Sequence, residues 1–389
     1  MSEAYIVAAT RTAGGKREGR LFGWHPVDLA AAVLDEVVAR AGLPGGAVDD
    51  VIMGCVGQVG EQGLHVGRNA VLASNLPQSV PAVSIDRQCG SSQQSIHFAA
   101  QAVMSGAQDV VIAAGVESMS RVPMGSSGHW SKPPERGSAT SPQLAAKFPD
   151  PFFSQFKGAE MIASKWGQSR DDLDVFALQS HARAVAATDS GAFTAEVLAL
   201  DVDVDGVRER HFLDEGIRRD ATMDSIGKVR ALMEGGSITA ANASQICDGA
   251  AAVMVVSERA LKEHGLTPMA RIHAMTVTAG DPVIMLEEPL FATDRALNRA
   301  GMKIADIDLY EVNEAFAPVP LAWLSHTGAD PARLNVNGGA IALGHPLGGS
   351  GAKLMTTLVH ALRARGLRYG LQTMCEGGGI ANVTIIEAL

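Results

Sequence analysis

The chain has 389 residues, of which 47% are hydrophobic, 19% are charged and 42 are glycine. This length exceeds one typical domain, and the composition is that of a compact α/β protein with many tight turns rather than a disordered chain. The formal net charge of -10 argues against nucleic acid or an anionic membrane as a general partner, although a local basic patch can still bind an anionic substrate.

Four cysteines, Cys55, Cys89, Cys247 and Cys375, are widely spaced and form no CxxC pattern. They indicate neither a disulfide framework nor a zinc site, so we expect a reducing compartment and no bound metal. The N-terminal residues lack the features of a signal peptide, and no apolar stretch reaches membrane-spanning length. We therefore expect a cytoplasmic protein that does not enter a membrane.

The first helix is predicted to start at Pro26 and to stop at Gly42, with apolar residues on one face at helical spacing. A second helix follows the turn that holds Cys89 and closes at Gly106. Hydrophobic runs bounded by turn residues predict strands in this region at 49–56, 80–86 and 109–118.

The last third of the chain repeats this order. "AGMKIADIDLYEV", which begins with a helix stop at Gly301, is similar to the earlier "AGLPGGAVDDVIMG". A glycine-rich turn with His345, a helix from about Ser350 and a strand at 369–375 complete the second unit. A duplicated unit places Cys89 and His345 in equivalent strand-to-helix turns, where open α/β sheets bind ligands.

An insertion separates the two units. The stretch 124–143 is rich in Gly, Ser and Pro and predicts a loop, and a helix is expected near 170–187. We expect three parts: an N-terminal half made of 1–118 and 245–268, an inserted domain at 119–244, and a C-terminal half at 269–389.

Cys89 stands where a helix begins, and unpaired backbone N–H groups and the helix dipole at that place favour thiolate over thiol. A buried structural cysteine is the alternative, because free cysteine is among the most buried residue types. An imidazole such as His345 can take the proton of a nearby thiol. The glycines around His345 match neither GxGxxG nor the P-loop pattern, which disfavours phosphate binding by this turn.

Two further polar positions follow predicted strands. Cys375 runs into three glycines whose backbone N–H groups can form an oxyanion site, although a core cysteine is the alternative. Asn313 ends the strand at 306–313, and its alternative role is that of a helix N-cap with Glu314 in the first turn.

The motifs "QCGSSQQS", "NEAFA", "NVNGGAIALGHPLGGSG" and "CEGGG" resemble, in order and separation, those of the thiolase family, and the similarity to its degradative members covers essentially the whole chain. The resemblance implies a five-layer α-β-α-β-α fold, built from two duplicated βαβαβαββ halves with an inserted loop domain. It also implies an acetyl-CoA C-acyltransferase that forms a homodimer or homotetramer and uses coenzyme A as a substrate, with no other cofactor.

The resemblance further implies roles for single residues. Cys89 attacks the 3-keto carbon of a 3-oxoacyl-CoA, His345 activates its thiol, and Cys375 acts as acid and base toward acetyl-CoA. Asn313 holds a water beside the enolate oxygen, and the backbone N–H groups of Cys89 and Gly377 bind the tetrahedral oxyanion. Coenzyme A is expected to contact six residues, namely Arg218, Ser225, Ser244, Met285, Ala315 and Phe316.

The chain departs from the family pattern at several positions. The usual "NASGxNDGAAA" is altered by Gln245 and Cys247, which puts the backbone of that turn in question, and Glu376 stands beside Cys375. Short-chain members usually carry His-Met-Gly where this chain has "FKG" at 156–158. The absence of His-Met-Gly favours a larger acyl group, and some motifs look like those of thiolases acting on steroid side chains.

Three other functions compete with this interpretation. A short-chain acetyl-CoA acetyltransferase would make acetoacetyl-CoA. A ketoacyl-synthase-like condensing enzyme shares the duplicated fold but resembles a Cys-His-His site that Cys375 does not supply. A non-catalytic acyl-CoA or sterol carrier is disfavoured because both cysteines, His345 and Asn313 are retained.

Overall fold

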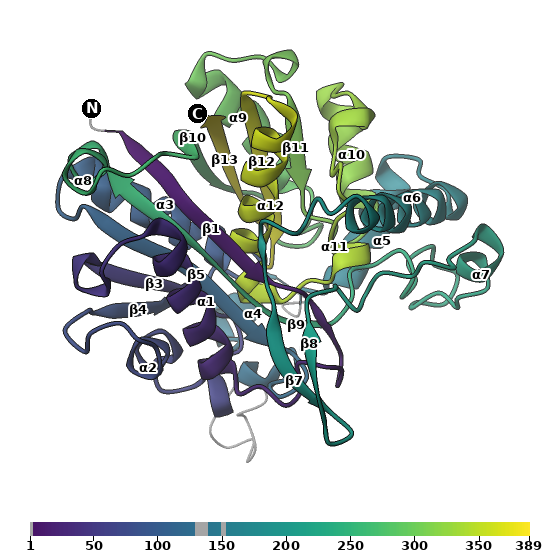
Figure 1. The fold of residues 1–389 in the computed structure, drawn as a ribbon. Helices are drawn as coiled ribbons and strands as arrows, with labels where there is room; N and C mark the ends of the chain where they lie inside the picture. The colour runs from purple at the N-terminus through teal and green to yellow at the C-terminus, as the bar shows by residue number, and fades with distance from the viewer. Residues whose placement is uncertain (1–2, 129–138, 149–152) are drawn as a thin grey trace.

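The computed structural model describes residues 3–128, 139–148 and 153–389. Its main strands follow one path, β11-β12-β13-β10-β1-β9-β5-β3-β4, in which two sheets are joined edge to edge (Figure 1). The junction is short, because β1 pairs with β10 only at Tyr5 with Arg271 and Ile6 with Ala270. The two sheets therefore pair with each other along one short seam.

The two sheets have the same strand order. The N-terminal sheet runs β4-β3-β5-β9-β1, and the C-terminal sheet runs β11-β12-β13-β10 with an isolated parallel bridge between Tyr310 and Leu334 in the place of a fifth strand. This correspondence confirms the expected duplication. The strands of the first sheet are β1 (Ala4–Thr12), β3 (Asp50–Gly54), β4 (Ala82–Ile85), β5 (Val110–Ser118) and β9 (Cys247–Ser257). Those of the second are β10 (Ala270–Ala279), β11 (Leu309–Val312), β12 (Tyr369–Glu376) and β13 (Ile380–Ala388).

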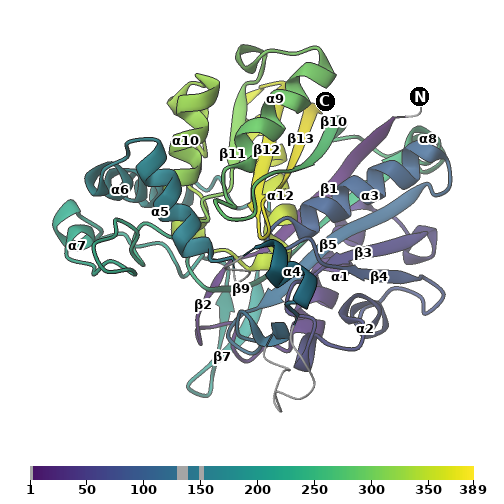
Figure 2. The ribbon, with the colours of Figure 1, turned by 180° about the vertical axis from the view of Figure 1, so that it is seen from behind.

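Helices cover both sheets on both faces, as the front and back views show (Figure 2). Apolar side chains of α3 (Ser91–Ser105) and α12 (Ser350–Arg365) share one buried cluster with strands of both sheets. The outer faces are covered by α1 (Pro26–Ala41) and α2 (Val66–Ala73) on the N-terminal half, and by α9 (Glu288–Ala300) and α10 (Pro318–Thr327) on the C-terminal half. The expected α-β-α-β-α layering is confirmed.

The repeat extends to the ends of equivalent helices. Pro26 occupies the first turn of α1, and Gly42 closes that helix with φ of 69°. Gly301 closes α9 in the same left-handed conformation, with φ of 66°. Glycine adopts this conformation without the Cβ clash that other residues suffer, so both helices stop where the sequence predicts.

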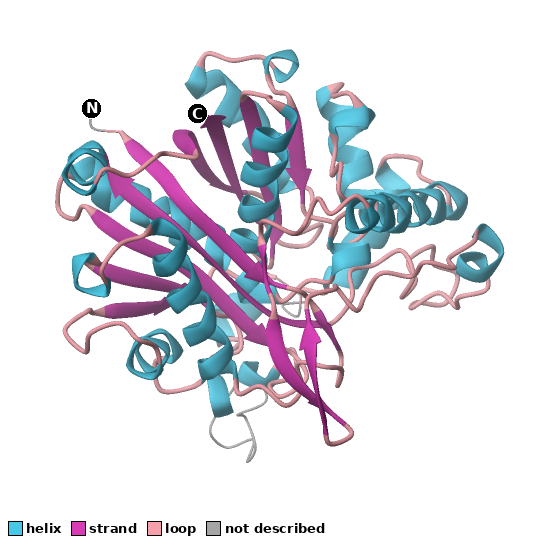
Figure 3. Cartoon of the chain, viewed as in Figure 1, coloured by secondary structure: helices cyan, strands magenta, loops and turns pink. Residues whose placement is uncertain are grey.

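The segment between β5 and β9 lies beside the two halves, and its long helices are visible apart from the sheets in Figure 3. Its strand β6 pairs with β1, which attaches this segment to the N-terminal sheet, and β7 and β8 form a separate hairpin. Part of the loop expected at 124–143 lies outside the described residues. The elements here are α4 (Pro142–Lys147), α5 (Gln155–Lys165), α6 (Arg170–Asp189), β6 (Val197–Leu198), β7 (Leu200–Val204), β8 (Val207–His211) and α7 (Met223–Gly227).

Three short elements complete the fold: β2 (Gly15–Lys16), α8 (Glu258–His264) and α11 (Ala340–Leu343). Within the described ranges, no helix combines the length and the apolar character needed to cross a bilayer.

Candidate active site

Cys89 lies in a tight turn between β4 and α3. The turn is closed by the N–H of Gly90, which donates to Arg87 O at 3.1 Å, and by the N–H of Ser91, which donates to Gln88 O at 3.0 Å. Gln88 has φ of 48°, a left-handed conformation that is uncommon for a residue other than glycine and is found in strained functional turns. The chain is thereby forced to present Cys89 at the N-terminal end of α3, as the sequence predicts.

The ionisation of Cys89 differs from the expectation. The thiol is only 9% exposed, and this burial raises its pKa to about 12, with the Glu376 carboxyl as the next contribution. Desolvation of the charged form outweighs the backbone N–H groups and the helix dipole. Cys89 is therefore a thiol in the resting protein, not a preformed thiolate.

His345 is held by the first turn of α12. Its Nδ1 lies 2.5 Å from Oγ of Ser350, and that hydroxyl donates to Pro346 O at 2.9 Å. Both contacts are satisfied when Nδ1–H donates to Oγ and the hydroxyl donates to Pro346 O, and in this tautomer Nε2 is the basic atom. Nε2 is buried and has no partner among the described residues. Burial lowers the pKa of His345 to about 3, so the ring is neutral.

The strand end that carries Cys375 meets the Cys89 turn. A Cβ placed on Gly90 would overlap Oε1 of Glu376, and one placed on Gly377 would lie 2.9 Å from Oε1 of Gln88. Cys375 is completely buried, and burial raises the pKa of its thiol well above the usual value, with Cys89 as the next contribution. The structure thus brings Cys89, Cys375 and Gly377 together from the two halves.

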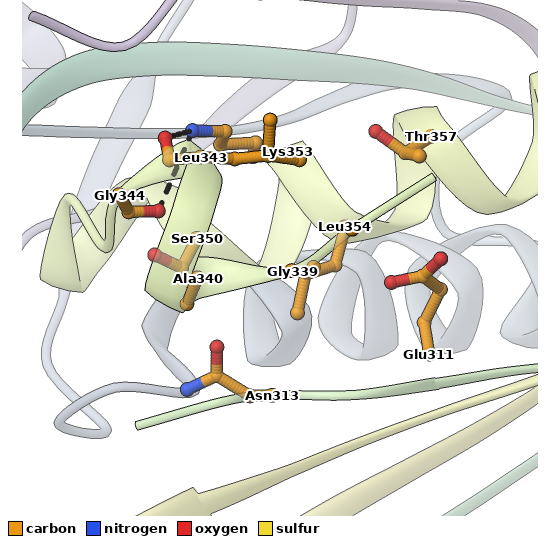
Figure 4. A pocket seen from close by; sticks show the side chains of 11 residues that line it. Glu311, Asn313, Gly339, Ala340, Leu343, Gly344, Ser350, Lys353, Leu354 and Thr357 are labelled. Carbon is orange, nitrogen blue, oxygen red and sulfur yellow. Dashed lines mark hydrogen bonds between the residues drawn. The ribbon is translucent and has the colours of Figure 1, made fainter. Parts of the chain in front are cut away.

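Asn313 follows β11 and faces a small internal cavity of about 10 Å³, which is the size of one water molecule. Figure 4 shows its amide directed from β11 toward Ser350 and Ala340. Both polar atoms of this side chain are buried without a partner among the described residues. Asn313 is not a helix N-cap, because α10 begins only at Pro318 with Ala317 at its N-cap. Glu314 is buried and not in a helical first turn.

A larger pocket of about 480 Å³ opens beside His345. Met119 and Leu347 line it and also belong to the buried cluster that contains Cys89, so the pocket and this cluster share two side chains. Phe156 lines its wall and packs edge to face on Phe316, with ring centroids 5.6 Å apart. Four expected coenzyme A contacts line this pocket, namely Arg218, Ser244, Ala315 and Phe316.

Two expected coenzyme A contacts lie elsewhere. Ser225 sits in α7, where its hydroxyl donates to Thr222 O at 2.9 Å and accepts from Thr222 N, because the two residues form a capping box. Met285 is buried in the C-terminal core with φ of 59° and does not line the pocket. Thr222 is the N-cap of α7 and Ser225 is the third residue of the helix, and neither Ser225 nor Met285 is among the residues that line the pocket.

Several residues of the site were missed by sequence reasoning. Lys16 and Arg17 line the large pocket. The basic run "GKREGR" at 15–20 is the sequence feature that could have indicated them. Ser350 orients His345, but a serine at a helix start carries no signal of its own. Glu117 accepts from the backbone N–H groups of Val56, Gly57 and Gly348, which fixes the segment after His345.

The side chain of Cys247 fills the space beside Gly344, which has no side chain of its own. A Cβ on Gly344 would lie 2.6 Å from Sγ of Cys247, and Gly344 has φ of 80°. Burial raises the pKa of Cys247 to about 12, so it is an inert thiol beneath the His345 turn. Within the described part of the chain, no three His, Cys, Asp or Glu side chains gather in a way that can hold a metal ion.

These features match a known family along the whole chain. The model of the thiolase N-terminal domain matches residues 4–259, and that of the thiolase C-terminal domain matches residues 266–388. The chain belongs to the thiolase family, which confirms the family and the fold expected from the motifs.

Individual relatives share this full-length match. The steroid 3-ketoacyl-CoA thiolase FadA6 of Mycobacterium tuberculosis is 50% identical, over 100% of this chain and 95% of that protein. The 3-ketoacyl-CoA thiolase of Bacillus subtilis is 41% identical, over 100% of both. Among solved structures, human mitochondrial 3-ketoacyl-CoA thiolase superposes with a TM-score of 0.89 at 36% identity, covering 100% of this chain and 99% of the other. Bacillus anthracis acetyl-CoA acetyltransferase has a TM-score of 0.91 at 35% identity, with the same coverage.

Proposed function

We propose that this protein is a 3-ketoacyl-CoA thiolase that cleaves a bulky 3-oxoacyl-CoA with coenzyme A, giving acetyl-CoA and an acyl-CoA two carbons shorter. The observation that carries the proposal is the contact between the Cys89 turn and the Cys375 strand end, together with a buried, unpartnered Nε2 of His345 in a pocket that shares Met119 and Leu347 with the Cys89 cluster. Two thiols and one base are the groups that two successive acyl transfers require.

The first step is attack of Cys89 on the 3-keto carbon. Because the thiol and the imidazole are both neutral, Nε2 of His345 takes the thiol proton as the S–C bond forms. The tetrahedral oxyanion is stabilised by the backbone N–H groups of Cys89 and Gly377. The C2–C3 bond then breaks, its electron pair leaves with acetyl-CoA, and the shortened acyl group stays on Cys89.

Cys375 supplies the proton for the departing carbanion. Its strongly raised pKa suits a group that must arrive as an acid, and its thiolate then takes the proton of incoming coenzyme A. The coenzyme A thiolate attacks the acyl-Cys89 thioester, the bond between the acyl carbon and Sγ of Cys89 breaks, and the Cys89 thiolate takes back the proton held on His345. His345 and a water held by Asn313 stabilise the enolate oxygen by donating hydrogen bonds to it. The buried, unpartnered amide of Asn313 supports this role.

Coenzyme A binds in the large pocket in this proposal. Lys16, Arg17 and Arg218 line it and supply positive charge for phosphate groups, and Ser244 and Phe316 line the same pocket. The inserted domain, 119–244, provides the Arg218 side of the pocket, and the halves 1–118 with 245–268 and 269–389 provide the reacting groups.

The pocket wall supports a bulky acyl group. The apolar part of the pocket lining includes Met119, Met124, Phe156, Leu232 and Ile246. Phe156 stands where short-chain thiolases usually carry histidine, and its ring makes this part of the wall apolar, which suits a steroid-derived or long acyl chain. The steroid thiolase FadA6, at 50% identity, supports the same class.

The test is a series of kcat/KM values for 3-oxoacyl-CoA thioesters from four carbons to steroid side chains. We expect the maximum at the bulky end, with an acyl adduct on Cys89 in intact-mass spectra. A maximum at four carbons would instead make the protein a short-chain acetyl-CoA acetyltransferase. No cleavage of any substrate, together with retained acyl-CoA binding, would make it a carrier.

We also propose a homo-oligomer assembled through β4. This strand ends the sheet, and Val83 on it is 40% exposed, while Leu64 beside the adjoining helix α2 is 96% exposed. An uncovered strand edge with apolar neighbours is a template for pairing with a second chain. Acyl-CoA and coenzyme A are the small-molecule partners, and the expected cytoplasmic location stays a prediction.

A further inference from the structure

Gln245 bonds two segments that are far apart in the sequence. Its Nε2 donates to Gly216 O at 2.8 Å in the inserted segment and to Ile341 O at 2.7 Å in α11. Its backbone N–H donates to Ala340 O at 3.4 Å, and its carbonyl accepts from the N–H of His345 at 3.1 Å. The side chain and the backbone of one residue therefore join the inserted segment to the turn that carries His345.

Gly216 makes this contact possible. A Cβ on Gly216 would lie 2.6 Å from Ala342 O and 3.0 Å from Oε1 of Gln245, so the two backbones approach too closely for any side chain. Arg218, two residues further on, lines the large pocket, and so do Gln245 and His345. The hydrogen bonds of Gln245 therefore lie between Arg218, a cation of the pocket, and the imidazole of His345, the catalytic base of the proposed function.

The same inserted segment is anchored a second time. Asp214 accepts from Gly14 N at 2.7 Å and from Arg11 Nη1 at 2.9 Å, and it lies 3.6 Å from Nζ of Lys353. Lys353 donates to Leu343 O at 2.5 Å, two residues before His345 (Figure 4). Asp214 is held in this way at one end of the segment. The amide of Gln245 then fixes the distance between residues 216–218 and α11.

We propose that Gln245 is a positioning residue for thiolysis, which couples the coenzyme A side of the pocket to the placement of His345. This inference rests on the proposed function. Both protons of its amide are used, one on each segment, and a side chain without an amide leaves the carbonyls of Gly216 and Ile341 without this donor. Catalytic groups tolerate displacements of only about 0.5 Å, so losing the bridge is expected to lower turnover rather than stability alone.

The experiment compares Gln245→Met, which keeps the length without the amide, and Gln245→Gly, which removes the side chain. Gln108→Met is the matched control, because Gln108 is also half-buried and its Nε2 donates to Asp50 at 3.1 Å in the N-terminal half. Active sites are counted as acyl-Cys89 by intact mass, and kcat per site and KM for coenzyme A are measured. Both Gln245 variants are expected to lose about tenfold in kcat per site and to show a raised KM, while the control keeps wild-type values.

Two results would overturn the proposal. Wild-type kinetics in Gln245→Met with loss only in Gln245→Gly would show that the side chain merely fills space. A loss of countable sites with unchanged kcat per site would show a purely structural role.

Absence of thiolysis in the wild type would refute the proposed function and leave this inference open to a second measurement. Coenzyme A is then expected to change the rate at which iodoacetamide modifies Cys89 in the wild type and to change it less in both Gln245 variants. An equal change in all three proteins would overturn the coupling.

Discussion

His345 Nδ1 and Ser350 Oγ lie 2.5 Å apart at the start of α12, and the serine hydroxyl donates a hydrogen bond to Pro346 O. This pair sets which nitrogen of the imidazole is basic and where it points. A histidine that acts as a base needs such an orienting partner as much as it needs a suitable pKa.

Ser350→Ala is expected to lower kcat about 100-fold, because a misplaced catalytic group costs roughly that factor. Steady-state kinetics of thiolysis measure the loss. Ser74→Ala is the control, since its hydroxyl also donates to a backbone carbonyl, Val71 O at 2.9 Å, but has no histidine partner. Equal activity of Ser350→Ala and wild type would show that the turn alone orients His345.

The alkylation rate of Cys89 without substrate is expected to rise through the alkaline range. Only the thiolate reacts, and a pKa raised from 9.0 to about 12 means that the thiolate fraction increases about tenfold per pH unit from pH 7 to pH 11. Iodoacetamide modification followed by peptide mass spectrometry measures this rate. A plateau beginning below pH 7 would reveal a preformed thiolate and imidazolium pair instead.

Asn313→Ala is expected to separate activity from stability. Its side-chain amide is buried without a partner in the described residues, so its removal costs the fold no hydrogen bond that the structure shows. The variant loses the water that Asn313 holds beside the enolate oxygen, and losing one such donor typically costs about 10² to 10³ in kcat. Thermal unfolding and thiolysis of the same preparation measure the two effects. A lower Tm with full activity would assign Asn313 to the core.

Val83→Lys is expected to give a smaller assembly, because lysine on an edge strand opposes strand pairing. Light scattering after size-exclusion chromatography measures the mass. Val175→Lys serves as the control, since Val175 is similarly exposed but lies on helix α6. An unchanged mass in both variants would place the interface away from β4.

The sequence determined the local features of this protein. Pro26, Gly42 and Gly301 mark helix ends through their own backbone preferences, and the run of motifs identified the thiolase family. Periodicity and the repeated order of elements predicted a duplicated α/β unit, because buried strands and amphipathic helices carry their pattern in every turn. The five layers were predicted from the resemblance to the thiolase family.

Tertiary structure decided what depends on neighbours distant in the chain. The thiol of Cys89 has a raised pKa because burial and Glu376 act on it, and neither is visible from a helix start. The hydroxyl of Ser225 pairs with Thr222 in a capping box, and Met285 packs in the C-terminal core. Gln245 gained its bridge only when Gly216 came close. Charge state and contact depend on solvent exclusion and on distances in space, and a single chain read in order contains neither.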